Sequence, residues 1–209
     1  MAKTKEQLLN ILDQFQLDEK VVSAEPFGNG HINDTLKVTN EKGEIKYVLQ
    51  RINHLIFTNV DMLQNNIHVV TTHIRKKLEE KGETDIDRKV LTFLPTKDGK
   101  KYYFDGDSYW RVCLFIPRSK SYEEVTPELS YEAGKAFGDF QTMLSDIPEG
   151  TLGETIPDFH NMEFRLKQLR DAVAADAAGR VKEVQYFLDE IERRADEMCK
   201  AERLHREGK

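Results

Sequence analysis

A glycine-rich segment, Phe27-Gly-Asn-Gly-His-Ile-Asn-Asp-Thr35, contains the residues best suited to bind phosphate. It lies between two segments rich in β-forming residues. Small residues in such a strand–turn–strand loop let the backbone close over phosphate groups and donate N–H groups to them. Walker loops and dinucleotide fingerprints open helices instead, and neither consensus occurs in this chain. The alternative is a plain hairpin turn in which glycine supplies a positive φ.

A second polar feature, Gln50-Arg51, interrupts the apolar run Tyr47-Val-Leu-Gln-Arg-Ile52. Long polar side chains in such a run usually mark an edge strand or a solvent-facing side. Here the run follows the glycine-rich segment and precedes a long predicted helix. This order is typical of a kinase small lobe, in which a strand offers a cation to the nucleotide phosphates.

A third segment, Tyr109-Trp-Arg-Val-Cys-Leu-Phe-Ile-Pro117, ends a predicted strand with large apolar residues. A segment that links two lobes can line a cleft and bind a flat heterocycle through its backbone groups. A buried core strand would show the same pattern, so both interpretations remain open.

Other chemistries lack the residues they need. His68 and His73 are five positions apart on a predicted helix, so they do not share a face as zinc ligands would. The chain contains no Cys-x-x-Cys and no Gly-x-Ser-x-Gly, which argues against a zinc site and against a serine hydrolase.

The composition is that of a globular protein and excludes several classes of partner. The 209 residues carry a formal net charge of −6, which argues against binding to duplex nucleic acid. The longest apolar stretch, Val112–Ile116, is far shorter than the roughly 20 residues of a membrane-spanning helix. Two cysteines and an N-terminus without an apolar run predict a cytoplasmic protein with neither a disulfide framework nor a secretory signal.

Hydrophobic periodicity predicts an α+β fold with a change of composition near residue 117. Residues 1–117 are expected to form one domain with an antiparallel sheet of five or six strands and one long helix, and residues 118–209 a helical second domain. The predicted strands are 21–27, 35–38, 45–52, 90–94, 100–104 and 109–116. The predicted helices are 5–15, 60–82, 126–144, 162–173 and 181–204.

The order of motifs resembles a known family. The resemblance rests on the three segments above, extended to Asn53 in the second, and on Ala133-Gly-Lys-Ala-Phe-Gly138 and Ile156-Pro-Asp-Phe-His-Asn161. The chain is similar to the amino-terminal part of the aminoglycoside phosphotransferase and choline kinase group, most closely to its N-acetylhexosamine 1-kinase branch. The resemblance implies a protein-kinase-like small lobe followed by the first helices of a helical large lobe. It also implies an ATP-dependent kinase that phosphorylates a hydroxyl of a sugar or amino sugar.

Carried over to this chain, the resemblance implies a nucleotide site built from three segments. Arg51 is expected to supply the phosphate cation, with Gln50 as the rival if the strand register differs by one residue. The helix from residue 60 usually offers a glutamate to that cation, but its face carries Gln64, Asn65 and Asn66. The residues expected around the nucleotide are Gly28, Asn29, Gly30, His31, Asn33 and Thr35 in the loop, with Leu114, Phe115 and Ile116 in the hinge around adenine.

The catalytic part of the family pattern is missing from this chain. No His-x-Asp followed closely by Asn and no Asp-x-Asp occurs after residue 118. Positioning and metal charge supply most of the catalysis of phosphoryl transfer, so we expect this chain alone to be inactive, with Mg²⁺ ligands lying beyond residue 209. His160 is a candidate substrate contact, and the alternative is a loop histidine that caps the next helix.

Two rival functions remain from other classes. One is a non-catalytic nucleotide-binding module, and the other is a helical interaction protein. If the helices lack a covering segment, apolar residues such as Val184, Leu188 and Ile191 should be exposed and promote self-association.

Overall fold

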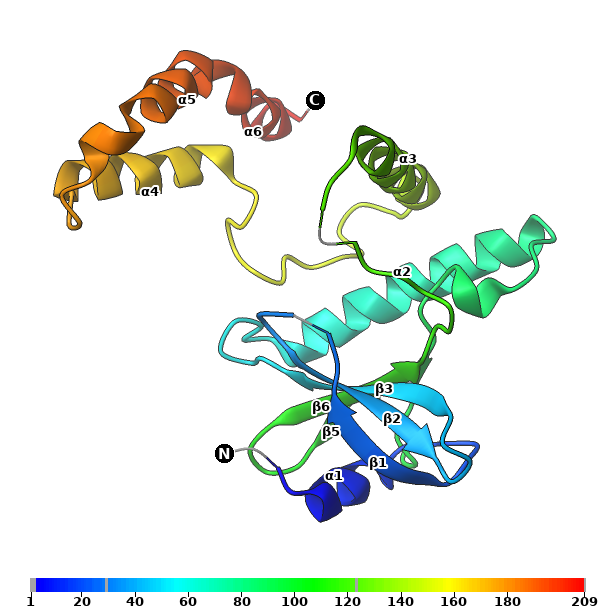
Figure 1. Ribbon diagram of the computed structural model, residues 1–209. Helices are drawn as coiled ribbons and strands as arrows, with labels where there is room; N and C mark the ends of the chain where they lie inside the picture. The colour runs from blue at the N-terminus through cyan, green and yellow to red at the C-terminus, as the bar shows by residue number, and fades with distance from the viewer. Residues whose placement is uncertain (1–2, 29, 123, 209) are drawn as a thin grey trace. The chain divides into compact units, whose positions relative to one another are not determined.

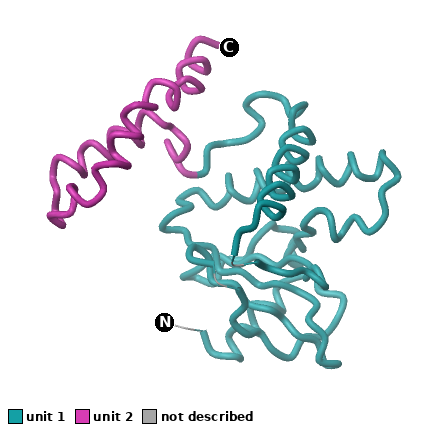
Figure 2. The backbone as a smooth tube through the Cα atoms, turned by 45° about the horizontal axis from the view of Figure 1, so that its top comes forward, with its two compact units in different colours: residues 1–155 teal, residues 156–209 magenta. Residues whose placement is uncertain are grey.

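The computed structural model describes residues 3–28, 30–122 and 124–208. The chain divides into two compact units, unit 1 with residues 1–155 and unit 2 with residues 156–209 (Figure 2). Unit 1 contains every strand, and the described elements after residue 117 are all helical. The strands therefore all precede residue 117, whereas the two compact units meet at residues 155 and 156. The compact unit extends beyond it because helix α3 packs on helix α2, and a functional division at this point stays a prediction.

The strands form a six-stranded sheet in the order β1-β2-β3-β6-β4, with β5 paired to β6, and every pairing is antiparallel. This confirms the predicted α+β class and antiparallel sheet. The predicted strands 90–94 and 100–104 are shorter than expected, with two residues each. Val90, at the start of the first, lies outside any strand and is buried against α2. The strands are β1 Val21–Pro26, β2 Asp34–Asn40, β3 Ile45–Ile52, β4 Phe93–Leu94, β5 Tyr103–Phe104 and β6 Tyr109–Leu114.

Helix α1 (Lys5–Leu12) covers one face of the sheet (Figure 1). Thr4 and Gln7 form a capping box at its start, which satisfies N–H groups that have no partner within the helix. Its buried side chains pack on Leu49 and Trp110 of the sheet. The helix ends at Leu12, earlier than predicted, and Phe15 bridges to Thr96 instead.

Helix α2 (Val60–Glu80) covers the opposite face (Figure 1). Asn59 caps it by accepting a 2.9 Å hydrogen bond from the Met62 N–H. Its apolar stripe contacts the sheet through Val60 and Leu63, which pack on Ile52. Strand side chains alternate between faces, so the partners of α1 and α2 identify which face each residue of β3 and β6 occupies.

Helix α3 (Pro127–Leu144) completes unit 1 and starts as predicted, with Thr126 as its cap. Its end packs against Leu78 of α2, and Asp146 accepts a 2.5 Å contact from Lys77 Nζ. None of its residues is buried, and Tyr131 and Phe137 are 71% and 70% exposed.

Unit 2 consists of α4 (Met162–Ala175), the 3₁₀ turn η2 (Val181–Val184), α5 (Gln185–Met198) and α6 (Lys200–Arg206). The prediction of one continuous helix over 181–204 was wrong, because the chain bends at Cys199. The bend buries Cys199 and lets Arg206 form a two-bond ion pair of 2.7 and 2.8 Å with Glu163 on α4. None of the described helices combines the length and hydropathy needed to cross a membrane.

Candidate functional site

The glycine-rich loop joins β1 directly to β2. The Phe27 N–H donates to the Thr35 carbonyl at 2.9 Å and closes the hairpin, and Gly28 adopts a φ of +78° that favours glycine. The side chain of Asn33 accepts a 2.9 Å bond from the Asn53 N–H, which fixes the loop beside the end of β3. The predicted site residue Asn29 lies outside the described residues.

One cavity of about 700 Å³ brings together five of the predicted residues, namely Gly28, Gly30, Asn33, Thr35 and Arg51. It lies beside α1, since Lys5, Leu8 and Trp110 also line it. His31 and the hinge residues 114–116 are not part of its lining.

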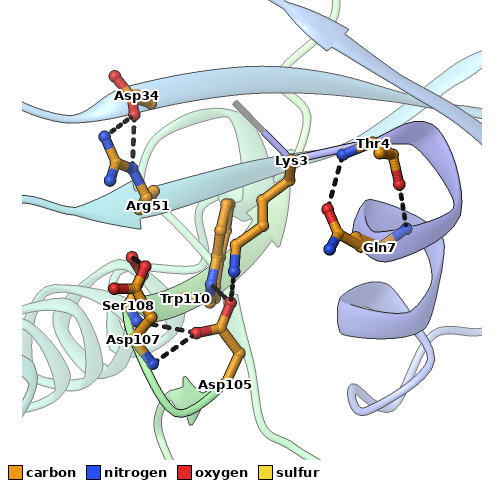
Figure 3. A network of polar contacts seen from close by, with 9 residues as sticks. All are labelled: Lys3, Thr4, Gln7, Asp34, Arg51, Asp105, Asp107, Ser108 and Trp110. Atoms are coloured by element: carbon orange, nitrogen blue, oxygen red, sulfur yellow. Dashed lines mark hydrogen bonds and ion pairs between the residues drawn. The ribbon is translucent and has the colours of Figure 1, made fainter. Parts of the chain in front are cut away.

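Arg51 lies on the α1 face, because it shares a side of β3 with Leu49. Its Nε donates to Asp34 Oδ2 at 2.6 Å, and its Nη2 also contacts this oxygen (Figure 3). Both side chains are largely exposed, at 45% and 62%. The expected phosphate cation is thus held in a surface ion pair on the side away from α2.

A second ion pair borders the same cavity. Lys3 Nζ lies 2.8 Å from Asp105 Oδ2, which also accepts a 2.9 Å bond from Trp110 Nε1 (Figure 3). Partial burial acts to raise the pKa of Asp105, but Lys3, the N–H groups of Ser108 and Asp107, and Trp110 outweigh it and lower the pKa to about 2. This carboxylate is therefore ionised at neutral pH, and its contacts join α1 to the sheet.

A different polar group occupies the α2 face. Gln50 lies on the same side of β3 as Ile52, which packs on α2. On the neighbouring strand β6, Arg111 lies directly opposite Gln50. Arg111 Nε donates to Gln50 Oε1 at 3.0 Å, and Gln50 Nε2 donates to Thr35 Oγ1 at 3.0 Å. The Arg111 guanidinium carbon lies 5.3 Å from the centre of the Phe93 ring.

Two donors in this polar group are buried without a hydrogen-bond partner among the described residues. They are Nη1 of Arg111 and Nε2 of Gln64 on α2. Gln64 is only 2% exposed. Burial lowers the pKa of Arg111, with a smaller opposing effect from Cys113. Burial likewise raises the pKa of the Cys113 thiol to about 11, so at neutral pH the thiol carries no charge that could neutralise Arg111.

The predicted hinge contacts the start of the glycine-rich loop. The rings of Phe27 and Phe115 meet edge to face, with centres 5.9 Å apart. The N–H groups of Leu114 and Phe115 donate to the carbonyls of Thr92 and Lys46, both at 2.9 Å. Among the described residues the Ile116 N–H has no backbone acceptor.

His160 belongs to unit 2, and its ring contacts Phe159 at 4.9 Å. The residue that caps α4 is Asn161, whose side chain accepts a 3.0 Å bond from the Phe164 N–H. The alternative role of His160 as a helix cap is therefore wrong. Its role as a substrate contact stays a prediction.

Sequence reasoning missed Arg111, although period-two alternation in Tyr109–Leu114 separates Arg111 from the buried Trp110 and Val112. Within residues 3–28, 30–122 and 124–208, no group of three or more His, Cys, Asp or Glu side chains could hold a metal ion. No family model matches this chain.

Proposed function

We propose that unit 1 is the nucleotide-binding lobe of an ATP-dependent phosphotransferase that acts on a small-molecule hydroxyl. The acceptor class suggested by the sequence resemblance is a sugar or amino sugar, as in N-acetylhexosamine 1-kinases. The order of elements supports this proposal: a glycine-rich loop between the first two strands, a third strand with polar side chains, and a long helix packed on the sheet.

The contact between Phe27 and Phe115 carries the proposal. Phe27 starts the glycine-rich loop and Phe115 belongs to the predicted hinge, so their contact supports a single ligand that reaches both segments. A flat heterocycle would accept a hydrogen bond from the Ile116 N–H and pack on apolar side chains of the hinge. The phosphates would then extend along the loop, whose backbone N–H groups favour anions.

We expect residues 1–209 to bind ATP without transferring phosphate. After residue 118 the chain contains neither the His-x-Asp motif nor the Asp-x-Asp motif that the resemblance requires for the base and for Mg²⁺. Binding should accordingly depend little on Mg²⁺.

Calorimetry with ATP and with adenosine tests the nucleotide site. Ile116→Asp should weaken both ligands alike by at least tenfold, because a carboxylate would spoil the apolar slot for the base. Val125→Asp is the matched control, since Val125 is 81% exposed, and it should bind as the unsubstituted chain does. Failure of the unsubstituted chain to bind either ligand, or normal binding by folded Ile116→Asp, would contradict the proposal.

A second candidate function, a helical interaction protein, is favoured by the exposed aromatic residues of α3. Tyr131 and Phe137 are both at least 70% exposed, and exposed apolar patches often mark interaction sites. Sedimentation of the chain at high concentration tests this candidate. Association that Phe137→Ser reduces would support it, and a strict monomer would count against association with itself.

A further inference from the structure

We propose that Arg111, on β6, is the cation that binds the nucleotide phosphates, with Gln50 as the residue that positions it. This inference rests on the proposed nucleotide-binding function. It assigns the phosphates to the α2 face of the sheet, and it assigns Arg51 a structural role.

The first argument is the unsatisfied state of the Arg111 guanidinium. Its Nε is bonded to Gln50, while its Nη1 is buried and has no partner among the described residues. No carboxylate in the described chain contributes to its charge balance. Arg111 is half-buried, and a buried N–H of a charged group without an acceptor is costly, because burial removes hydration that nothing replaces. A phosphate oxygen would supply both the missing hydrogen bond and the missing charge.

The second argument is preorganisation. Gln50 accepts the bond from the Nε of Arg111, and the guanidinium carbon lies over the Phe93 ring, 5.3 Å from its centre. An arginine held at its Nε and packed over an aromatic ring presents its remaining N–H groups as a fork, the geometry that binds phosphate well. A flexible surface cation would have to be ordered by the ligand, which would reduce the affinity gained.

The third argument is the link to the glycine-rich loop. Thr35 is the second residue of β2, directly after the loop, and its hydroxyl accepts the bond from Gln50. A continuous row of contacts therefore runs from the loop through Thr35 and Gln50 to Arg111. This row lies on the face that α2 covers, where a kinase lobe holds its phosphate cation.

The fourth argument concerns α2, whose Gln64 places a side-chain amide on the same face of the sheet. Gln64 is buried, and its Nε2 also lacks a partner in the described part of the chain. It lines a cavity together with Phe93, whose ring centre lies 5.3 Å from the Arg111 guanidinium carbon; Arg111 itself does not line this cavity. Because Gln64 is neutral, it leaves the charge of Arg111 free for a ligand.

Arg51 differs from Arg111 in each of these respects. It lies on the opposite face, 45% of its side chain is exposed, and Asp34 already neutralises it. Phosphate would have to displace that carboxylate to bind Arg51.

Calorimetry on three variants of the whole chain tests the assignment with ATP and with adenosine. Arg111→Met should lower the affinity for ATP at least tenfold and leave the affinity for adenosine within twofold. In the proposed site only the phosphates contact the guanidinium. Arg111→Lys should give an intermediate loss, since it keeps the charge and loses the fork. Arg51→Met should bind both ligands within twofold of the unsubstituted chain.

The outcomes separate this inference from the proposed function. Loss of selectivity for ATP in Arg51→Met together with normal binding by Arg111→Met would overturn the inference and leave the proposed function standing. Absence of ATP binding by the unsubstituted chain would overturn both. Thermal unfolding must first show that each variant folds. If Arg111→Met does not fold, the comparison of Arg111→Lys with Arg51→Lys decides, and equal ATP affinities of these two variants would overturn the inference.

Discussion

The two faces of the sheet treat their positive charges differently. On the α1 face, Arg51 is paired with Asp34 and Lys3 with Asp105, so these charges are balanced within the protein. On the α2 face, Arg111 is half-buried, and its buried Nη1 has no hydrogen-bond partner among the described residues. A cation that a carboxylate already neutralises has less to gain from an external anion than a rigid cation without such a partner. This contrast is the basis for our proposal that the phosphates bind on the α2 face, although the cavity lined by the loop residues lies beside α1.

The largest expected change in stability is on the α1 face. Leu12 of α1 is completely buried in the cluster that joins this helix to the sheet. Leu12→Ala should lower the free energy of unfolding by about 2–5 kcal/mol, because it removes apolar contacts and leaves a cavity. Urea unfolding measures this cost. The ratio of ATP to adenosine affinity should not change in the folded variant, and a changed ratio would contradict the division between the faces.

An intermediate effect is expected at Asp105, which is 9% exposed and has a pKa lowered from 3.8 to about 2. Because folding favours the ionised form, its stabilisation is present above pH 4 and is lost as the pH falls toward 2. The shift corresponds to about 2 kcal/mol at neutral pH. Asp105→Asn should therefore be less stable than the unsubstituted chain at pH 7.

Stability measured from pH 7 to pH 2 checks this pattern. The difference between the two proteins should shrink as the pH falls below 4. A constant difference would mean that Asp105 acts through packing and not through its charge.

The smallest expected change in stability is on the α2 face, at Gln64. Gln64→Met should raise the free energy of unfolding by about 1 kcal/mol, because it replaces a buried donor that has no partner with an apolar group of similar shape. Asn66→Leu is the matched control on the same helix. Asn66 exchanges bonds of 2.6 and 3.0 Å with the Gly153 backbone, so its loss should destabilise by about 1–3 kcal/mol. Equal losses in both variants would show that Gln64 is satisfied in solution.

Strong periodicity allowed much of unit 1 to be predicted. The stripe from Val60 to Leu78 identified α2, and the turn residues separated β1, β2 and β3. The break at Cys199 gave no signal, because neither glycine nor proline marks it. The break accompanies tertiary contacts that a sequence does not reveal, namely the burial of Cys199 and the pair between Arg206 and Glu163.

The site was predicted less completely than the fold. The loop residues could be recognised by composition, and five predicted residues line one cavity. The faces of Gln50 and Arg51 could not be assigned, because both lie in one apolar run and only packing against α1 or α2 distinguishes them. Arg111 was missed for a related reason, since its lack of a partner is a property of the packed interior and not of the sequence.

The arginine side chains of the unsubstituted protein provide the most direct test of the central claim. Titration of ATP into ¹⁵N-labelled protein, followed through the Nε–H resonances, compares Arg111 with Arg51 in a single sample. We predict that the Arg111 resonance shifts in proportion to ATP bound, that adenosine leaves it in place, and that the Arg51 resonance stays unchanged. A shift of Arg51 with an unchanged Arg111 would contradict the assignment of the phosphates to the α2 face.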